Sequence, residues 1–338
     1  MQRFRTVSAA LAALLAASVG GRALAWGATG HRLIGALAVE ALPAGLPDFV
    51  RSADAGFTID EYAREPDRWK GAGRAHDSDL NPAHFVDVGD DGKVLGGPAL
   101  AALPETRALY ETGLRAVGTD SWKAGYLPYS ITESWQQLAN DFAFWRVEQA
   151  ALAHVADAGH LQWFRNDMAA RQSLILRDIG VLAHYVGDGS QPLHVTVHFD
   201  GWGPSPNPEG FTNNRIHAPF EGSFVHDNAD VAEARGMMAP YRACGCAIAE
   251  WTRRYLSATA GQVAPLYRLW KGRAFRGSDP LGRAFVDMRL AAGASALRDA
   301  VADAWAASES QKVGWPAPVN LAQVQAGLDP YDSLYGTD

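Results

Sequence analysis

Apolar residues recur at helical spacing through most of this chain, and this period constrains the fold more than any other feature of the sequence. Residues 134–155 show it clearly, with Trp135, Leu138, Phe142 and Trp145 on one stripe. Similar stripes occupy residues 31–42, 168–186, 241–256 and 285–305. Because side chains three or four residues apart share one face of a helix, this pattern predicts an all-α fold.

Evidence for strands is nearly missing, since period-2 alternation is confined to one short extended piece at residues 84–88. Residues 201–214 are rich in Gly, Pro and Asn and predict a loop, as does much of the tail after Lys312. The 338 residues contain 48% hydrophobic residues, enough for a sizeable core. With no internal repeat and no dividing linker, we expect one all-α domain over residues 26–338.

Residues 1–25 have the composition of a secretory signal peptide. Arg3 and Arg5 form a basic start, Ala9–Val19 is apolar, and Ala23–Ala25 matches a cleavage site of the A-x-A kind. The apolar run is shorter than the ~18 residues that a membrane span needs, and no later segment reaches that length. We therefore expect an exported protein, periplasmic or extracellular.

The charge balance limits how this chain could bind a polyanion. The formal net charge is −7, and removal of residues 1–25 takes away three arginines, which leaves 27 basic against 37 acidic residues. Such a protein does not bind nucleic acid through a broad basic surface, so any phosphate chemistry would need metal ions as its positive charge. The two cysteines, Cys244 and Cys246, are compatible with an uncommon short-range disulfide or with two free thiols.

Histidines and carboxylates occur in patterns suited to metal binding. His184 and Asp188 are four residues apart, which places both on one face of a helix, and His217 and Glu221 repeat this spacing. His194 follows a Pro-containing turn and can approach from another direction. Neither pair has the H-E-x-x-H form of a metalloprotease, which disfavours that class.

Further ligand candidates lie upstream. After cleavage Trp26 would have a free α-amino group, and this group, the Trp26 carbonyl and His31 could bind one metal. The full ordered set is Trp26, His31, Asp67, His84, His184, Asp188, His194, His217 and Glu221. Nitrogen and oxygen donors without cysteine suit several zinc ions with open positions for water. The other histidines are expected to be structural or surface residues: His76, His154, His160, His198 and His226.

Four motifs in this order resemble the S1/P1 nuclease family and its relatives, the bacterial zinc-dependent phospholipases C. They are Trp26-Gly-Ala-Thr-Gly-His31, His84-Phe85-Val86-Asp87, His184-x-x-Gly-Asp188-x-x-Gln-Pro-Leu-His194 and His217-x-x-x-Glu221. The resemblance spans residues 26–221 and implies a mostly helical fold around three zinc ions. It implies a first zinc held by Asp67, His84, His184 and Asp188, and a second held by His194, His217 and Glu221. A third would be held by the Trp26 main chain, His31 and a bridging Asp188.

The resemblance also implies an activity. The expected enzyme is a zinc-dependent endonuclease that hydrolyses single-stranded DNA or RNA to 5′-phosphates, with which 3′-nucleotidase activity is compatible. Zinc would lower the pKa of a bound water toward about 7. Asp67 is the candidate to orient or deprotonate that water, and Lys70 or Arg68 the candidate to neutralise phosphate. Phe85 would stack on a base and Asp87 would accept from the base edge. No stable protein partner is implied, and we expect a monomer.

Two other classes of function remain open. A phospholipase C acting on phosphatidylcholine-like lipids is the main alternative, because Glu221 is typical of the phospholipases whereas the nucleases usually have Asp there. The segment between His84 and His184 is longer than in either relative. Its aromatic residues could wall the site or pack in the core: Trp122, Tyr126, Tyr129, Trp135, Phe142, Phe144 and Trp145. A zinc-binding protein without catalysis would require misplaced ligands or a covered site.

Overall fold

The computed structural model describes residues 26–203 and 206–336, and helices dominate it. Helix accounts for 65% and strand for 3% of the structure, and the described residues form isolated bridges but no sheet. The predicted all-α class is therefore confirmed. The predicted signal peptide lies outside the described residues. No helix in the described part of the chain combines the length and hydrophobicity needed to cross a bilayer.

The helices range from single turns to rods of more than thirty residues. The five long ones are α1 (Gly27–Glu40), α8 (Leu127–His154), α9 (Ala158–Ser190), α12 (Ile248–Ala260) and α14 (Pro280–Ala307). The shorter α-helices are α2 (Asp48–Arg51), α3 (Ala53–Tyr62), α4 (Glu65–Arg68), α5 (Arg74–Leu80), α6 (Arg107–Arg115), α7 (Ser121–Ala124), α10 (Val225–Asn228), α11 (Val231–Met237), α13 (Val263–Lys271), α15 (Leu321–Gln325) and α16 (Tyr331–Tyr335). Three 3₁₀ turns, η1 (Asn81–His84), η2 (Leu100–Ala102) and η3 (Pro192–His194), and one π-helical turn, η4 (Pro219–Phe224), complete the set.

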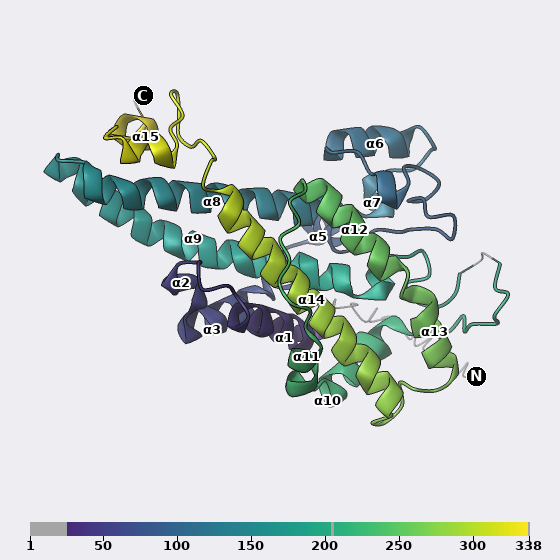
Figure 1. The fold of residues 1–338 in the computed structure, drawn as a ribbon. Helices are drawn as coiled ribbons and strands as arrows, with labels where there is room; N and C mark the ends of the chain where they lie inside the picture. The colour runs from purple at the N-terminus through teal and green to yellow at the C-terminus, as the bar shows by residue number, and fades with distance from the viewer. Residues whose placement is uncertain (1–25, 204–205, 337–338) are drawn as a thin grey trace, which may run out of the picture.

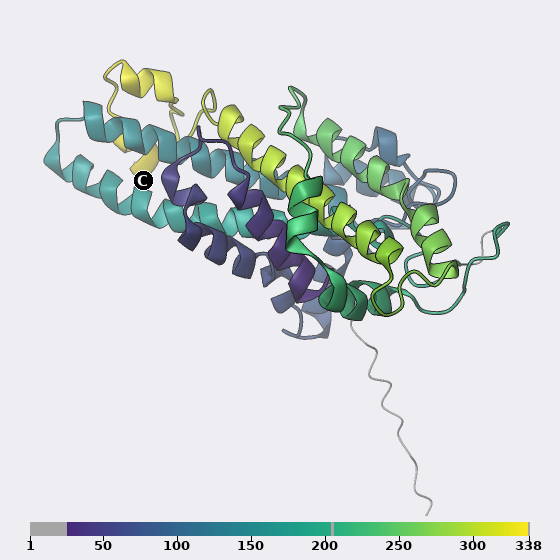
Figure 2. The same cartoon turned by 60° about the horizontal axis from the view of Figure 1, so that its bottom comes forward.

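The centre of the fold is the antiparallel pair of α8 and α9, which lie side by side over most of their length (Figure 1). Helices α1, α3 and α14 pack against α9, and α12 and α15 pack against α8 (Figure 2). As a result, residues 178–190 at the end of α9 are buried without interruption. A helix segment that is buried all round must satisfy every polar side chain that it carries, and this segment carries two of the predicted metal ligands.

One of the predicted boundaries was wrong. The helix expected from residue 241 begins at Ile248, because Cys244 and Cys246 form a disulfide and Gly245 between them has a φ of 59°. Side chains two residues apart do not face each other on a helix, so the segment that contains this disulfide cannot be helical. Much of the tail after Lys312 lies outside helices, as predicted, and the tail also contains the short helices α15 and α16. A capping box between Asn320 and Gln323 starts α15, and Val324 is buried.

The aromatic residues of the long segment before His184 are mainly core residues. Tyr126, Tyr129, Phe142 and Trp145 are buried, whereas Trp122 is exposed. Core packing is therefore the explanation for most of this stripe.

The same long segment also supports residues 85–88, which are extended as predicted, whereas His84 ends the 3₁₀ turn η1. The Asp87 amide donates to the Ala124 carbonyl at 2.8 Å, and Val86 forms a bridge with Gly125. Gly125 has a φ of 75°, and a Cβ there would lie 2.0 Å from the Phe85 carbonyl oxygen. Only glycine permits this close approach, by which the segment holds Phe85 and Asp87 in place.

Glu148 of α8 is a buried carboxyl group whose ionisation should set a pH dependence of stability. Its nearest cation is Arg171, with Nε at 3.4 Å from Oε1, and burial, assisted by Asp167, raises the Glu148 pKa from 4.5 to about 9. A raised carboxyl pKa gives stability that is complete below pH 4.5 and is lost as pH rises toward 9. The side chain of Glu148→Gln stays neutral, so we expect this loss of stability to disappear in the variant. Relative to the wild type, its free energy of unfolding should rise by up to about 1.4 kcal/mol per pH unit above pH 5.

Urea unfolding of the wild type and Glu148→Gln at pH 5, 7 and 8.5 would measure this effect. Glu105→Gln is the matched control, because Glu105 is exposed. Parallel stability profiles for the wild type and Glu148→Gln would show that Glu148 does not carry the pH dependence.

Candidate metal centre

His184 and Asp188 project from adjacent turns at the end of α9, and both are fully buried. The His184 Nδ1 lies 2.8 Å from the Ala63 carbonyl, to which it donates. This hydrogen bond leaves Nε2 as the nitrogen with a free lone pair, and it lies 3.4 Å from the Asp188 Oδ2. A histidine whose other nitrogen is fixed by a carbonyl is the usual arrangement of a metal-binding imidazole.

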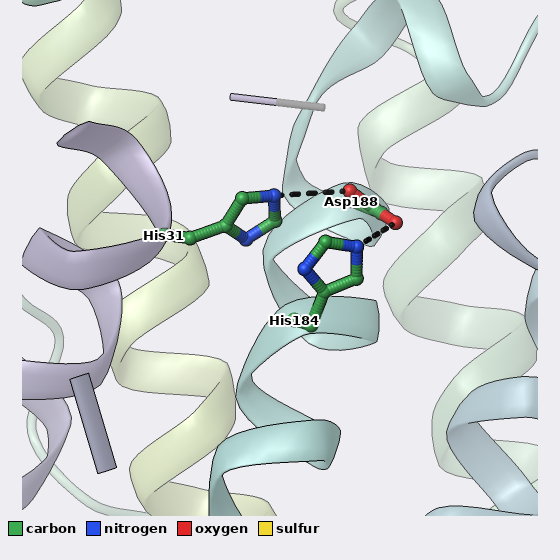
Figure 3. A group of neighbouring side chains, drawn as sticks. All are labelled: His31, His184 and Asp188. Carbon is green, nitrogen blue, oxygen red and sulfur yellow. Dashed lines mark ion pairs between the residues drawn. The ribbon is translucent and has the colours of Figure 1, made fainter. Parts of the chain in front are cut away.

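His31 reaches the same place from α1. Its ring stacks on His184 with 4.0 Å between centroids, and its Nε2 lies 3.5 Å from the Asp188 Oδ1 (Figure 3). Gly187 permits this approach, because a Cβ at that position would lie 2.9 Å from the His31 Nδ1. Close packing against His31 therefore explains why the motif has glycine at residue 187.

His84 and Asp67 complete this side of the centre. The His84 Nδ1, at the end of η1, lies 3.1 Å from the Asp188 Oδ2 and 2.9 Å from the His184 Nε2. Asp67 of α4 has a carboxylate oxygen within 4.8 Å of ligand nitrogens of His84 and His184. Lys70 Nζ donates to the Asp67 Oδ1 at 2.7 Å. A cation therefore lies beside the one partly exposed carboxylate of the group.

His194, His217 and Glu221 form a separate group. The Glu221 Oε2 lies 2.8 Å from the His217 Nε2 and 3.5 Å from the His194 Nε2. The His194 Nδ1 donates to the His84 carbonyl at 2.6 Å, which orients its ring. The helix widens into the π-helical turn η4 at Glu221, and such turns are frequent at functional sites.

Burial controls the charge of these groups. It lowers the pKa of His31 and His84 well below the usual range and that of His184 to about 3, so these rings are neutral at pH 7. Burial also raises the pKa of Asp188. For Glu221, burial raises the pKa, but the attraction of His217 and His194 outweighs it and lowers the pKa to about 2. Neutral imidazoles are the protonation state that binds a divalent cation, and a bound cation would favour the ionised form of Asp188 that burial disfavours.

Several buried polar atoms at this centre lack a hydrogen-bond partner among the described residues. They are both ring nitrogens of His31, the Asp188 Oδ1, the Glu221 Oε1 and the His217 Nδ1. Buried polar atoms in proteins are nearly always satisfied by a partner, and ions can supply it. The unpartnered atoms and the donor set of imidazole and carboxylate therefore fit metal ions, with zinc among the compatible ones.

The structure brings eight of the nine predicted ligands into three groups. They are His31, His184 and Asp188; Asp67, His84 and His184; and His194, His217 and Glu221. His184 thus belongs to two groups and lies closer to His31 than the sequence suggested. The five other histidines are absent from the three groups. His198 is one of these five, and it donates to Asp90 through Nε2 at 3.0 Å and accepts from the Gly203 amide.

Trp26, the ninth predicted ligand, lies beside the centre. Its indole Nε1 donates to the Gly187 carbonyl and to the Ser190 Oγ, both at 2.8 Å. Trp26, Gly27 and Glu221 line a common cavity of about 470 Å³. The Trp26 carbonyl accepts from the Gly30 amide at 3.2 Å. Trp26 therefore shares a cavity with Glu221, while its indole is hydrogen-bonded to α9.

A cavity of about 510 Å³ opens onto the metal centre. Three metal-ligand candidates line it, His84, His194 and His217, together with the predicted substrate-binding residues Lys70, Phe85 and Asp87. Burial raises the pKa of Asp87 from 3.8 to about 7. Arg68, the alternative to Lys70, does not line this cavity and pairs with Glu61 and Glu65.

Sequence reasoning missed several residues of this site. Gln191 is buried and donates from Nε2 to the Glu221 Oε2 at 3.0 Å, so it orients a metal-ligand candidate. Its place in the Gln-Pro-Leu-His motif was the signal that could have identified it. Lys123 and Phe199 also line the cavity. No local pattern marks them, since they come from the long segment and from the loop after His194.

Comparison of this chain with protein-family models, with curated proteins and with solved structures gave no match. The function of this chain is therefore inferred from the geometry of the residues described above.

Proposed function

We propose that this chain is an exported, zinc-dependent phosphodiesterase of the S1/P1 nuclease kind that cleaves single-stranded DNA or RNA. The observation that carries the proposal is the cluster of three buried groups of imidazoles and carboxylates beside a cavity with an aromatic ring and a lysine. Metal-assisted phosphodiester hydrolysis needs this combination of positive charge, water activation and substrate positioning. The products would be 5′-phosphates, and 3′-nucleotidase activity is compatible with the same site.

The chain's own residues would hold three zinc ions. The first would take Asp67, His84, His184 and Asp188, and the second His194, His217 and Glu221. The third would take His31, Asp188 and the amine and carbonyl of Trp26. When bound, the ions would supply Lewis acidity toward the phosphoryl group and lower the pKa of water. Gln191 and the Ala63 carbonyl would keep Glu221 and His184 in their orientations.

Asp67 and Lys70 are the residues that would act at the reacting phosphate. The Asp67 side chain is partly exposed, so one carboxylate oxygen can accept the proton of an attacking water while the other accepts from Lys70. The Lys70 ammonium lines the cavity, where it would neutralise a phosphate oxygen. Both roles depend on the ion pair of Lys70 with Asp67, which lies beside the metal centre.

Phe85 and Asp87 would position a nucleobase. Phe85 is half-buried on the cavity wall, which leaves ring surface for stacking, and every base has a face that can stack. Asp87 lies on the same wall and would bind the base edge. A base must be unpaired to reach both residues, which is the reason for proposing single strands.

A pH dependence should follow from Asp87. Because its pKa is about 7, the carboxyl group is mostly neutral below pH 7 and ionised above it. An ionised carboxylate accepts from base N–H groups, and hydrogen bonds to charged groups contribute about 1.5–3 kcal/mol. We expect KM for a guanine-containing single strand to fall about tenfold as pH rises from 6 to 8.

The Asp87→Asn variant tests this expectation. The ratio of its KM to the wild-type KM at each pH cancels the effect of titration at the metal centre, which both proteins share. KM in Asp87→Asn should change less with pH than in the wild type, while Asp54→Asn, at an exposed position, should follow the wild type. Identical KM profiles for the wild type and Asp87→Asn would remove Asp87 from base binding.

The Trp26 main chain provides another test. Trp26 and Glu221 line one cavity. A protein that starts at Trp26 has a free amine at that residue, whereas one that retains Ala25 has an amide, which is a poor metal ligand. We expect the extended protein to bind one zinc fewer per chain, measured by elemental analysis after dialysis against buffered zinc. Equal zinc content in the two proteins would exclude the amine as a ligand.

The proposed function itself is tested by turnover of single-stranded DNA and of phosphatidylcholine, each with and without a chelator. Chelator-sensitive cleavage of DNA without lipid turnover is expected. The second candidate is a phospholipase C. Phe199 favours it, because this apolar residue lines the cavity and is 47% exposed. Lipid turnover without DNA cleavage would establish that alternative. Full zinc content without either activity would indicate a zinc-binding protein without catalysis.

A further inference from the structure

A second cavity, of about 500 Å³, is formed by residues of α11, α12 and α14 and of the loop after α11. It shares no lining residue with the cavity at the metal centre. Its volume is within the range of about 300–1,000 Å³ that is usual for small-molecule sites. Neither the metal centre nor the proposed phosphodiester chemistry uses it.

One of the charged residues that line this cavity is a buried arginine. Arg289 is 7% exposed, and its Nε donates to the Ser190 carbonyl at 2.8 Å while Nη2 donates to the Thr259 Oγ1 at 2.9 Å. Within residues 26–203 and 206–336, no carboxylate forms an ion pair with Arg289, and Nη1 has no hydrogen-bond partner. The neighbouring arginines differ, because Arg254 pairs with Glu250 and Arg298 with Asp299.

The charge of Arg289 is therefore only partly compensated. Arginine remains protonated at neutral pH even where burial lowers its pKa, as it does here. The carbonyl end of α9 attracts the guanidinium through the helix dipole, but this is equivalent to about half an elementary charge. A buried charge without a full partner is costly, and an anion bound in the cavity would remove that cost.

Most of the remaining wall is apolar and adaptable, while the polar residues Arg254, Ser295 and Asp299 also line the cavity, with Arg254 and Asp299 each held in an ion pair. Met237 and Met288 are 44% and 37% exposed. Ala258 and Ala292 add small side chains, and Trp251, stacked on Tyr255, forms a further wall. Flexible methionines beside small residues suit a slender, apolar ligand of variable shape.

We propose that this cavity binds an amphipathic carboxylate of the fatty-acid class, with the carboxylate on Arg289 and the hydrocarbon chain along Met237 and Met288. The planar fork of a guanidinium matches the two oxygens of a carboxylate. The apolar walls match the chain, so charge and shape both select this class of ligand. The proposal is independent of the reaction at the metal centre.

Calorimetric titration of the full chain with dodecanoate, below its micelle concentration, tests the proposal. Dodecanol, with the same chain and no charge, and inorganic phosphate, with charge and no chain, are the matched probes. We expect one dodecanoate per chain, bound at least tenfold more tightly than dodecanol. Phosphate should bind at the proposed metal centre alone, so its heat should be the same in the wild type and in the Ala292→Trp variant, which fills the second cavity. Equal affinity for dodecanoate and dodecanol would overturn the role of Arg289. Phosphate binding that Ala292→Trp weakens as much as dodecanoate binding would overturn the role of the apolar walls.

Variants locate the binding site. Removal of Arg289 could unfold the end of α9, so the first variant is Ala292→Trp, which fills the groove and leaves Arg289 in place. Ala284→Trp is its control, on the exposed side of the same helix. We expect Ala292→Trp to weaken dodecanoate binding at least tenfold and Ala284→Trp to leave it unchanged. Undiminished binding in Ala292→Trp would mean that dodecanoate binds elsewhere and would refute the site.

Discussion

The His184→Ala variant is expected to lose bound zinc and phosphodiester cleavage together. His184 belongs to two of the three ligand groups, and its Nε2 lies between His84 and Asp188, so one substitution affects both groups. Metal ions contribute several kcal/mol to stabilising a phosphoryl transition state. Loss of that contribution corresponds to a fall in kcat/KM of about a thousandfold or more.

Zinc content by elemental analysis and turnover of single-stranded DNA would measure this effect, with circular dichroism as the check that the helices persist. His160→Ala is the matched control, because His160 is a histidine of the same helix that pairs with Asp329 far from the metal centre. We expect wild-type zinc content and activity in the control. Retained zinc and activity in a folded His184→Ala protein would refute the proposed ligand set.

The Gly187→Ala variant should damage the centre without removing a ligand. A Cβ at residue 187 would lie 2.9 Å from the Nδ1 and 3.3 Å from the Cε1 of His31. Because α9 is packed on several sides, the His31 ring is the group that must move, and it would lose its stack on His184. A misplacement of about 1 Å can lower the rate by about a hundredfold, so we expect a loss of that size. We also expect one zinc fewer per chain.

A matched control and a double mutant make this prediction specific. Gly222→Ala adds the same methyl group beside Glu221, where no atom lies within 4 Å, and should leave zinc content and activity unchanged. In the His31→Ala background, Gly187→Ala should have little further effect, because the clashing ring is gone. Additive losses in the double mutant would show that the effect of Gly187 does not act through His31.

The sequence by itself determined the features that depend on local spacing. The helical class followed from apolar residues three and four apart, which an amphipathic helix must bury on one face. The pairs His184 with Asp188 and His217 with Glu221 followed from the same geometry, since residues four apart meet on a helix. The structure places each pair together as expected: the ligand atoms lie 3.4 Å apart in His184 and Asp188 and 2.8 Å apart in His217 and Glu221.

Only the tertiary structure decided how the separate segments meet. The stack of His31 on His184 depends on how α1 packs against α9, and the presence of Lys123 and Phe199 at the cavity depends on the placement of the short helix α7 and of a loop. The structure also decided between the disulfide and the free thiols of Cys244 and Cys246, and it alone identified the buried Arg289. The physical reason is that burial and charge compensation depend on neighbours distant in sequence, whereas periodicity reports only which face of a helix is apolar.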